Sequence, residues 1–329
     1  MPRDRFHREI DYLRISLTDR CNLRCVYCMP ETGSTHASST DALGTEEVER
    51  IVSAAARVGF RKIRLTGGEP TLRTDLLEVV ERIARVPGIV DVAMTTNGIL
   101  LPELAPRLRR AGLRRINVHL DSLDPEHVAQ IMRRGTFEQI WAGIEAAETA
   151  GFRPIKLNSV VVAGYNDGDV VDLARLTLER DWHVRFIELM PLGGGECARI
   201  STTRYVSNFG TRARIEEALG ALEMLEPIHP SDEARNYRLR GGRGVVGFIS
   251  PVSEPFCGSC NRMRLTSDGR FHLCLLNDDE IDVIGALREG ADPARLGEIL
   301  ERAVAAKPTG HALDLGVSTT SRSMHHIGG

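Results

Sequence analysis

Residues 12–28 read Tyr-Leu-Arg-Ile-Ser-Leu-Thr-Asp-Arg-Cys-Asn-Leu-Arg-Cys-Val-Tyr-Cys, and the architecture can be worked out from this stretch. Its first part, residues 12–17, is short and mostly apolar, which is typical of a buried β-strand. Cys21, Cys25 and Cys28 follow at once, so they are expected on a loop at the end of that strand. Three thiolates within eight residues can surround one small metal site.

Two kinds of metal site remain open for these three cysteines. A structural zinc ion takes four ligands in a closed tetrahedron, so zinc would need a fourth ligand from a distant part of the chain. A [4Fe–4S] cluster also has four corners, and three cysteines would leave one iron open. An open iron can bind a substrate, so the second reading predicts an enzyme.

The chain continues by alternating strands and helices up to about residue 190. Most of the strands are too apolar for a sheet with one face in water, which favours parallel strands covered by helices. The expected strands span residues 12–17, 62–66, 90–95, 115–120, 155–162 and 183–188, and the expected helices span 46–58, 75–85, 137–150 and 169–180, with another starting at Pro125. Such a chain forms either a doubly wound open sheet or a full or partial β/α barrel, and either one gathers its chemistry at the strand ends.

Local signals mark where several of these helices begin. Thr45, Asp75 and Asp124 are predicted as their N-caps. After Met190 the pattern changes, and the glycines at 193–195 suggest a flexible break. A helix over 214–222, strands near 236–240 and 245–249, and helices near 281–289 and 293–306 are expected there, before an aperiodic tail at 318–329. We therefore expect two domains, 1–190 and 191–329.

Composition limits the function classes. The chain has 329 residues, of which 42% are apolar, and its 45 acidic and 42 basic residues give a net charge of −3. These values are ordinary for a folded globular protein and argue against a nucleic-acid-binding surface that covers the whole molecule. Neither an apolar run of membrane-spanning length nor a signal peptide is visible, so the cytoplasm is expected. Thiols stay reduced there, so the seven cysteines are expected to be metal ligands or reactive groups.

The spacing C-x3-C-x2-C, with Tyr27 before the last cysteine, resembles the radical S-adenosylmethionine (SAM) superfamily. The resemblance implies that the open iron of a [4Fe–4S] cluster binds the amino and carboxylate groups of SAM. Electron transfer from the cluster then cleaves SAM and produces a 5′-deoxyadenosyl radical. Residues 66–70, Thr-Gly-Gly-Glu-Pro, would be only a turn if taken alone. In this context they resemble the segment that receives the SAM amino group.

A second group of cysteines, Cys257, Cys260 and Cys274, has the spacing C-x2-C-x13-C. Zinc ribbons often use C-x2-C, and His272 would then be a fourth zinc ligand. The alternative is a second [4Fe–4S] cluster with another open iron.

A radical SAM barrel followed by this second spacing resembles the molybdenum cofactor biosynthesis protein A family, the GTP 3′,8-cyclases. The resemblance covers essentially the whole chain. It is carried by residues 18–30, 64–70, 95–98, 186–191, 260–264 and 327–329. The implied fold is an incomplete (β/α)6 TIM-like barrel whose open side is closed by a C-terminal α+β region that carries the second cluster.

The resemblance also implies a reaction and partners. GTP lies between two [4Fe–4S] clusters, the radical takes hydrogen from ribose C3′, and the carbon radical attacks guanine C8. The product is 3′,8-cyclo-GTP, in the first step of molybdenum cofactor biosynthesis. Cyclic pyranopterin monophosphate synthase acts next, and a low-potential donor supplies electrons. No nucleic acid or membrane partner is expected, and a homodimer is compatible with the sequence.

The family's binding residues carry over position by position. GTP contacts fall on Arg14, Arg64, Thr95, Lys156, Arg262 and Arg264, and SAM contacts on Tyr27, Gly68, His119 and Met190. The chain departs from the family at His119, where a small hydroxyl residue is usual. The terminal Gly328 and Gly329 are implied to enter the active-site cavity. Arginine suits a triphosphate independently of any family, because its guanidinium binds phosphate oxygens in pairs.

Two rival functions stay open on the residues alone. A radical SAM maturase that modifies a peptide would want more C-terminal cysteines than three. A zinc-stabilised nucleic-acid-binding module is disfavoured by the net charge of −3. Cys197, the seventh cysteine, has no ligand spacing to the others and is expected to be a bystander.

Overall fold

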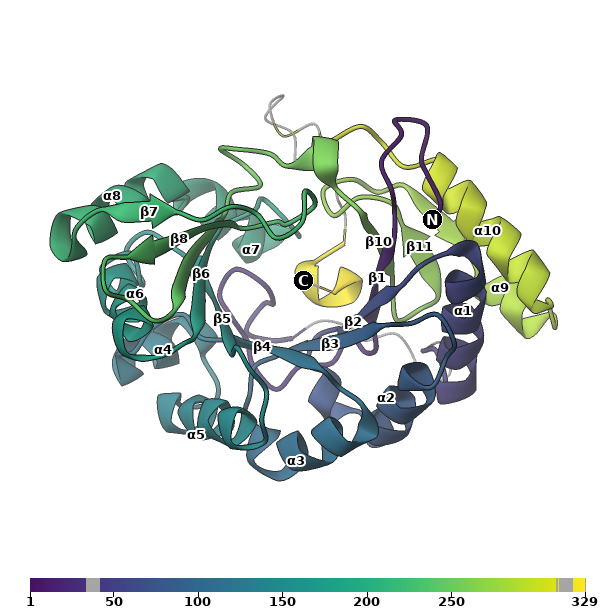
Figure 1. Cartoon of the computed structure of the whole chain (residues 1–329), viewed down its shortest axis with the longest axis horizontal. Coiled ribbons are helices and arrows are strands. Elements are labelled where there is room, and N and C mark those ends of the chain that lie inside the picture. Colours follow the sequence, from purple (N-terminus) through teal and green to yellow (C-terminus); the bar gives the residue numbers. More distant parts are fainter. Residues whose placement is uncertain (34–41, 312, 314–321, 329) are drawn as a thin grey trace.

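The computed structural model describes residues 1–33, 42–311, 313 and 322–328. Its centre is a single twelve-stranded sheet with the order β12-β11-β10-β1-β2-β3-β4-β5-β6-β9-β8-β7. The six central strands are parallel to one another and curve into a partial barrel (Figure 1). They are β1 (Tyr12–Ser16), β2 (Lys62–Thr66), β3 (Asp91–Thr96), β4 (Arg115–His119), β5 (Lys156–Val161) and β6 (His183–Glu188).

Helices cover the outer face of this barrel, as Figure 1 shows. They are α1 (Thr45–Val58), α2 (Leu76–Ala84), α3 (Leu101–Ala111), α4 (Pro125–Met132), α5 (Phe137–Thr149) and α6 (Val170–Glu179). In α1 the apolar face consists of Val48, Ile51, Val52 and Ala55, all of which are buried. A helix with one apolar stripe covers a sheet in this way because the stripe is removed from water. The incomplete (β/α)6 barrel is therefore confirmed, and the open doubly wound sheet is excluded.

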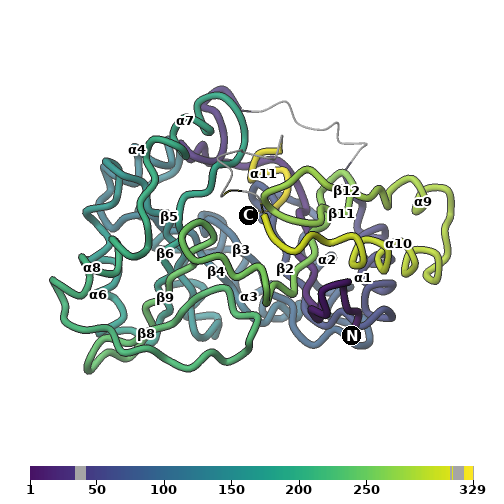
Figure 2. Tube along the Cα trace, turned by 90° about the horizontal axis from the view of Figure 1, so that it is seen from above, coloured from purple at the N-terminus to yellow at the C-terminus, as the bar shows by residue number. Residues whose placement is uncertain are grey.

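The C-terminal region extends the sheet at both edges. Val245–Ile249 (β9) pairs parallel with β6, while Arg262–Leu265 (β10) pairs parallel with β1. The other elements are α7 (Gly195–Thr203), α8 (Asn208–Leu219), β7 (Leu222–Met224), β8 (Arg235–Leu239), η2 (Cys257–Ser259), β11 (Arg270–His272), β12 (Glu280–Asp282), α9 (Ile284–Arg288), α10 (Pro293–Ala305) and α11 (Met324–Ile327). In Figure 1 α11 lies within the curve of the sheet, beside the C label, and Figure 2 shows it at one end of the barrel, next to β12.

Several local predictions were wrong. The helix predicted over 214–222 is α8, which ends at Leu219 and is followed by strand β7. The break predicted at 193–195 is brief, because α7 begins at Gly195. Helix α3 was not predicted, and neither were the short strands β10, β11 and β12.

One of the three predicted N-caps was also wrong, and a second, Asp75, stands at its predicted position before α2 without capping the helix through its side chain. Asp124 does cap α4, accepting hydrogen bonds from the backbone of Glu126 and His127. Gly44, rather than Thr45, is the N-cap of α1. Asp75 makes no side-chain cap, because its carboxylate binds Arg73 and the Thr45 hydroxyl instead. Within the described part of the chain, no helix is long and apolar enough to cross a lipid bilayer.

Candidate active site

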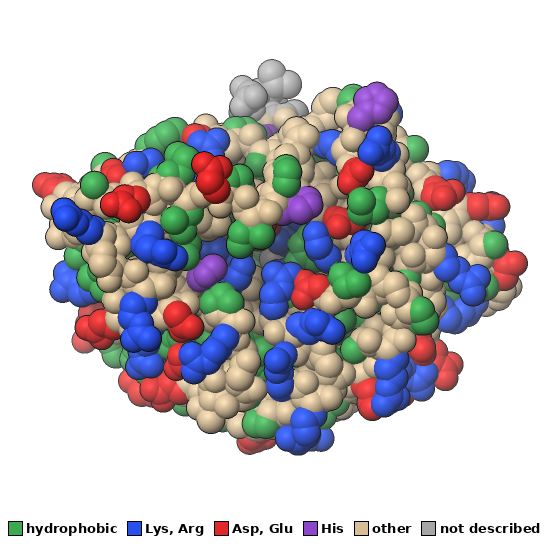
Figure 3. Space-filling view, in the orientation of Figure 1, with side chains coloured by type: hydrophobic (Ala, Val, Ile, Leu, Met, Phe, Trp, Pro, Cys, Tyr) green, Lys and Arg blue, Asp and Glu red, His purple; other side chains and the backbone are tan. Residues whose placement is uncertain are grey.

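Two adjoining pockets lie inside the barrel. The first pocket is lined by Cys21, Cys25 and Cys28 and has a volume of about 1030 Å³. The second pocket is lined by Cys257, Cys260 and Cys274 and has a volume of about 980 Å³. The side chains that line both pockets are Thr95, Asn158, Ile187, Met190 and Met324. The two cysteine triads therefore face two halves of one continuous space, and Figure 3 shows Lys and Arg side chains around the recess on this face.

The loop of the first triad is fixed by main-chain hydrogen bonds. The amide of Cys28 donates to the Cys25 carbonyl at 2.9 Å, and the amide of Val26 donates to the Ile131 carbonyl at 2.9 Å, at the end of α4. Burial raises the pKa of the Cys21 thiol to about 11 and raises the pKa values of Cys25 and Cys28 as well. A buried triad of this kind needs a bound cation before its thiols ionise.

The turn at residues 66–70 packs directly on the cysteine loop. A Cβ on Gly67 would lie 2.4 Å from the Thr18 carbonyl oxygen, and one on Gly68 would lie 2.3 Å from that of Arg20. Gly68 and Glu69 instead donate their amides to these two carbonyls, at 2.6 and 2.7 Å. The two glycines are needed here for close backbone approach, and Gly68 also lines the first pocket.

Glu69 holds the same turn from inside. Its carboxylate accepts hydrogen bonds from the backbone amides of Thr71 and Asn97 and from the hydroxyls of Thr71 and Thr96, all within 3.0 Å. The side chain is buried, and burial raises its pKa despite these donors. Glu69 thus connects the ends of β2 and β3 beneath the first pocket.

His119 takes part in a three-residue polar contact with Tyr27 and Asp121. Its Nε2 lies 2.9 Å from the Tyr27 hydroxyl and 3.0 Å from Asp121 Oδ2, while the Tyr27 hydroxyl donates to Asp121 at 2.8 Å. Although burial opposes it, the Asp121 carboxylate raises the pKa of His119. The His119 imidazole is therefore within hydrogen-bond distance of the tyrosine of the cysteine motif.

The second triad is assembled from three elements. Cys257 lies in the short helix η2, Cys260 precedes β10, and Cys274 follows β11. Arg8 donates to the Cys257 carbonyl at 2.8 Å, so the N-terminal segment supports this loop. Although burial opposes it, the charges of Arg262 and Lys307 lower the pKa of Cys260 to about 6.

The donor sets fit clusters better than a single metal ion. Among the described residues, no three His, Cys, Asp or Glu side chains are grouped closely enough to hold one ion. A [4Fe–4S] cluster spreads its thiolates over different irons, so it accepts a wider arrangement. His272, the alternative zinc ligand, is fully buried and places its Nδ1 3.0 Å from Glu280 Oε1.

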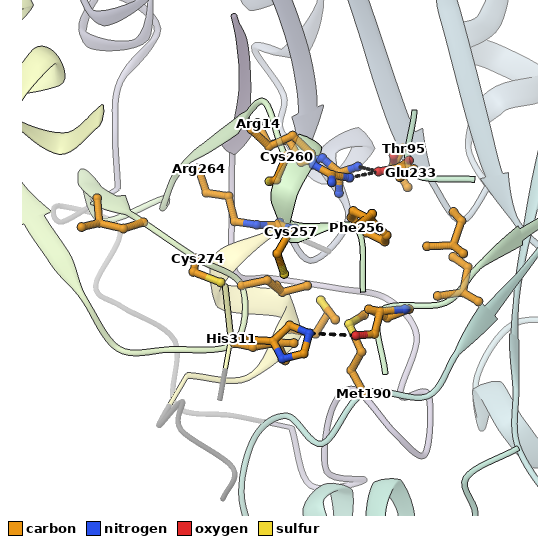
Figure 4. A pocket seen from close by; sticks show the side chains of 18 of the residues that line it. Arg14, Thr95, Met190, Glu233, Phe256, Cys257, Cys260, Arg264, Cys274 and His311 are labelled. Atoms are coloured by element: carbon orange, nitrogen blue, oxygen red, sulfur yellow. Dashed lines mark hydrogen bonds and ion pairs between the residues drawn. The ribbon is translucent and has the colours of Figure 1, made fainter. Parts of the chain in front are cut away.

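The predicted phosphate-binding arginines lie side by side on the sheet. Arg14 is the register partner of both Arg64 in β2 and Arg264 in β10, so the three occupy one row across the strands. Arg64 donates to the Tyr12 hydroxyl and, at 3.2 Å, to the Thr95 hydroxyl. Arg14, Arg262 and Arg264 line the second pocket, where Figure 4 shows Arg14 and Arg264 near the thiols.

Lys156 stands at the start of β5, opposite Asn117 of β4. Its ammonium is mostly buried, and this burial, together with the charges of Arg185, Arg115 and Arg64, lowers its pKa to about 7. Lys156 is therefore only partly charged at neutral pH, and it is not among the side chains that line the two pockets.

Several polar residues at this site were missed by the sequence reasoning. Asn117, with its amide oxygen turned toward them, accepts hydrogen bonds of 2.6 Å from Arg64 and Arg185. Arg185 is buried and also donates to Asn158 at 3.0 Å. Glu233 places its carboxylate among the arginines. Arg185 could have been found, because it lies in a predicted strand, whereas Glu233 lies in a loop without any periodic signal.

The C-terminal tail reaches the same space. Met324 lines both pockets, and the ring of His325 lies 3.2 Å from the Cys28 carbonyl oxygen. The Gly328 carbonyl accepts a hydrogen bond from Arg264. Gly329 lies outside the described residues.

Cys197 is buried in α7, and its electrostatic influence on Cys28 indicates that it lies near the first triad.

Comparisons with known proteins agree with this geometry. Residues 15–177 match the family model described as the radical SAM superfamily, and residues 182–313 match the model described as Molybdenum Cofactor Synthesis C. A GTP 3′,8-cyclase from Moorella thermoacetica is 46% identical over 326 residues, covering 99% of both chains. One from Petrotoga mobilis is 40% identical over 327 residues, again covering 99% of both.

Solved structures share the fold at low sequence identity. A crystal structure of Streptococcus suis SuiB has a TM-score of 0.65 and 13% identity, covering 92% of this chain and 67% of that one. The crystal structure of methylornithine synthase has a TM-score of 0.51 and 16% identity, covering 63% of this chain and 62% of that one. The chain belongs to the radical SAM superfamily. Within it, the chain belongs to the GTP 3′,8-cyclase family, which excludes the zinc-module reading and disfavours a peptide maturase.

Proposed function

We propose that this chain converts GTP to (8S)-3′,8-cyclo-7,8-dihydroguanosine 5′-triphosphate, as the first step of molybdenum cofactor biosynthesis. The observation that carries the proposal is the continuity of the two pockets through Thr95, Asn158, Ile187, Met190 and Met324. A SAM molecule in the first pocket and a nucleotide in the second would meet at these residues. The full-length similarity to GTP 3′,8-cyclases supports this assignment.

The chain's own residues have separable roles in this proposal. Cys21, Cys25 and Cys28 would hold one [4Fe–4S] cluster, and Cys257, Cys260 and Cys274 the other. When bound, the first cluster supplies the electron that cleaves SAM. Tyr27, Gly68, His119 and Met190 line the first pocket and would orient SAM beside the first triad.

The second pocket would bind the nucleotide. The side chains that line it include Arg14, Thr95, Arg262 and Arg264. Arg64 is the register partner of Arg14 in β2, and Lys156 lies in β5 opposite Asn117. Charge-assisted hydrogen bonds from arginine to phosphate oxygens are strong and directional, so they would fix the triphosphate. Fixing the triphosphate holds the ribose toward the first pocket, where proximity favours hydrogen transfer.

The partners are proposed on the same basis. Cyclic pyranopterin monophosphate synthase would take the product, and a low-potential donor would reduce the first cluster. All seven cysteines are free thiols, which supports a reducing compartment such as the cytoplasm. We also propose a homodimer, and light scattering would measure this oligomeric state.

The division into domains 1–190 and 191–329 stays a prediction. One hydrogen-bonded sheet runs through both parts, so the sheet itself marks no boundary between them.

The decisive experiment uses GTP labelled with deuterium at ribose C3′. Anaerobically purified holoenzyme is incubated with labelled GTP, SAM and a low-potential reductant, and the products are analysed by mass spectrometry. We expect 3′,8-cyclo-GTP and deuterium in 5′-deoxyadenosine. Deuterium-free 5′-deoxyadenosine with no cyclised nucleotide would contradict the proposal.

A further inference from the structure

The cationic second pocket already contains an anion of the chain itself. Glu233 Oε2 accepts hydrogen bonds from Arg14, at 2.8 Å, and from Arg262, and its Oε1 lies 3.6 Å from a terminal nitrogen of Arg185. Figure 4 shows this carboxylate directed at Arg14. The three arginines come from β1, β10 and β6, so a single carboxylate connects strands from opposite sides of the barrel.

The loop that delivers Glu233 lies mostly in water. This loop, residues 225–234, joins β7 to β8 and is closed at its base by a 2.8 Å hydrogen bond from the Leu225 amide to the Asn236 carbonyl. Residues 226–230 are all exposed, and Ile228 is 90% exposed. The Glu233 side chain is only 18% exposed. The carboxylate is therefore the part of the loop that is inserted into the pocket.

One carboxylate does not satisfy the donors around it. Nε of Arg14 and Nη2 of Arg262 are buried and have no hydrogen-bond partner among the described residues. Arg264 also lines this pocket, and burial with the charges of Arg14 and Arg262 lowers its pKa to about 9. Buried unpaired donors and a surplus of positive charge indicate a ligand with more oxygens and more charge than one carboxylate.

We propose that the Glu233 carboxylate competes with the phosphates of the substrate for the arginines of the second pocket. It thereby sets how many phosphates a nucleotide must carry before they strengthen its binding. The proposal rests on the proposed function, which supplies the guanine nucleotide as ligand. A nucleotide with a single phosphate would replace the carboxylate by another anion of similar reach, so its affinity would increase little. A triphosphate would also reach the donors that Glu233 leaves unpaired, so it would displace the carboxylate with a net gain.

Displacement needs only a small movement of the chain. The loop already lies at the surface, so a displaced Glu233 side chain would be hydrated by bulk water. The Leu225–Asn236 hydrogen bond lies at the base of the loop and need not break. Glu233 is therefore a specificity-determining residue that acts by leaving the site.

The test compares guanosine, GMP and GTP by isothermal titration calorimetry on anaerobic holoenzyme. In the unaltered protein we expect guanosine and GMP to bind equally within about twofold, and GTP to bind more tightly. In Glu233→Gln we expect GMP to bind about tenfold more tightly than guanosine, because one phosphate can then bind the free arginines. GTP should also bind about tenfold more tightly than to the unaltered protein.

Asp232→Asn is the matched control. It removes the same charge from the neighbouring position, but Asp232 is exposed, and among the described residues its carboxylate accepts a hydrogen bond from its own loop alone, from the His229 amide. We expect its three affinities to stay within about twofold of the unaltered values, because solvent screens exposed charges. Iron content and melting temperature establish that each variant is folded.

Two results would overturn the proposal. One is weaker GTP binding, or an unchanged ratio of GMP to guanosine affinity, in folded Glu233→Gln. Either result would mean that Glu233 stays in place and positions the arginines. The other needs no variant: GTP should accelerate amide hydrogen exchange in residues 225–234 of the unaltered protein, and slower or unchanged exchange would contradict displacement. Failure of the proposed function would look different, since the unaltered protein would then bind GTP no more tightly than guanosine and form no cyclised product.

Discussion

Arg264 donates a hydrogen bond from its guanidinium to the main-chain carbonyl of Gly328, 64 positions later in the chain. Gly328 has a φ of +72°, and a Cβ there would lie 2.5 Å from the Thr66 side chain. Only glycine fits this position without strain, since it has no Cβ and adopts positive φ freely. The contact brings the end of the chain to the arginines of the second pocket.

The tail should be required for cyclisation but not for folding. Deleting Gly328 and Gly329 removes the carbonyl that Arg264 binds, while the cysteine triads and the barrel keep their other contacts. We expect normal iron content and continued reductive cleavage of SAM, but no 3′,8-cyclo-GTP, measured by mass spectrometry. Normal cyclisation by the truncated protein would mean that the tail is only a frayed end.

The first triad should account for half of the iron. With both [4Fe–4S] clusters bound, the protein should contain about eight irons per chain. Replacing Cys21, Cys25 and Cys28 together by serine should remove about half of them and all SAM cleavage. Cys197→Ser is the control, since it alters another buried thiol near Cys28 and should leave both readouts unchanged. SAM cleavage by the triple variant would refute the ligand assignment.

The two arginines of β10 should bind the triphosphate. Arg262→Gln and Arg264→Gln each remove one charged donor from the second pocket, where both side chains are buried. Loss of one charge-assisted contact costs about 1.5–3 kcal/mol, which weakens GTP binding roughly 10- to 150-fold. Calorimetry on protein with full iron content measures this loss. Unchanged affinity in both variants would remove these residues from the binding site.

The pKa of Lys156, about 7 in the free protein, predicts a pH dependence of GTP binding. Below this pH the ammonium is charged and attracts phosphate, whereas above it the neutral amine does not. We expect GTP affinity to fall between pH 7 and 9, by up to about tenfold per pH unit. Lys156→Arg keeps its charge throughout and should abolish the decline. An equal decline in both proteins would assign it to another group.

His272 should not be a metal ligand. Its Nδ1 lies 3.0 Å from Glu280, which joins β11 to β12. His272→Ala should therefore lower the melting temperature while leaving the electron paramagnetic resonance signal of the second cluster intact. Loss of that signal from folded protein would restore a three-cysteine, one-histidine site.

The barrel could be predicted because its strands are short, mostly apolar runs that alternate with clear helices. The predicted bounds of β2 and β6 are those observed. Helix α3 escaped prediction because Pro102 and Pro106 interrupt its pattern, although Pro102 is tolerated in the first turn. The strands β10, β11 and β12 are only three or four residues long, too short for an alternating pattern to be recognised.

The residues of the candidate site also include some that the sequence predicts and some that it does not. The strand positions of Arg14 and Arg64 predict side chains that face a cavity; the two lie in one row, and Arg14 lines the second pocket whereas Arg64 lines neither pocket. Glu233 could not be found from sequence, because its partners Arg14 and Arg262 lie 219 and 29 positions away. A residue in an exposed loop acquires its role only through such tertiary contacts.

The pairing of β1 with β10 affects how the protein is made. Tyr12 pairs with Arg262, so one edge of β1 has no strand partner until residues 262–265 have been synthesised. At about 5–20 residues per second, the nascent chain carries this open edge for roughly 10–50 s. Cys260 and Cys274 flank β10 and β11 in the chain, so the second triad cannot assemble before this late step, whereas Cys21, Cys25 and Cys28 lie in one loop near the start of the chain. The second triad is therefore completed only late in synthesis, and until then the unpaired edge of β1 is open to aggregation and to chaperones.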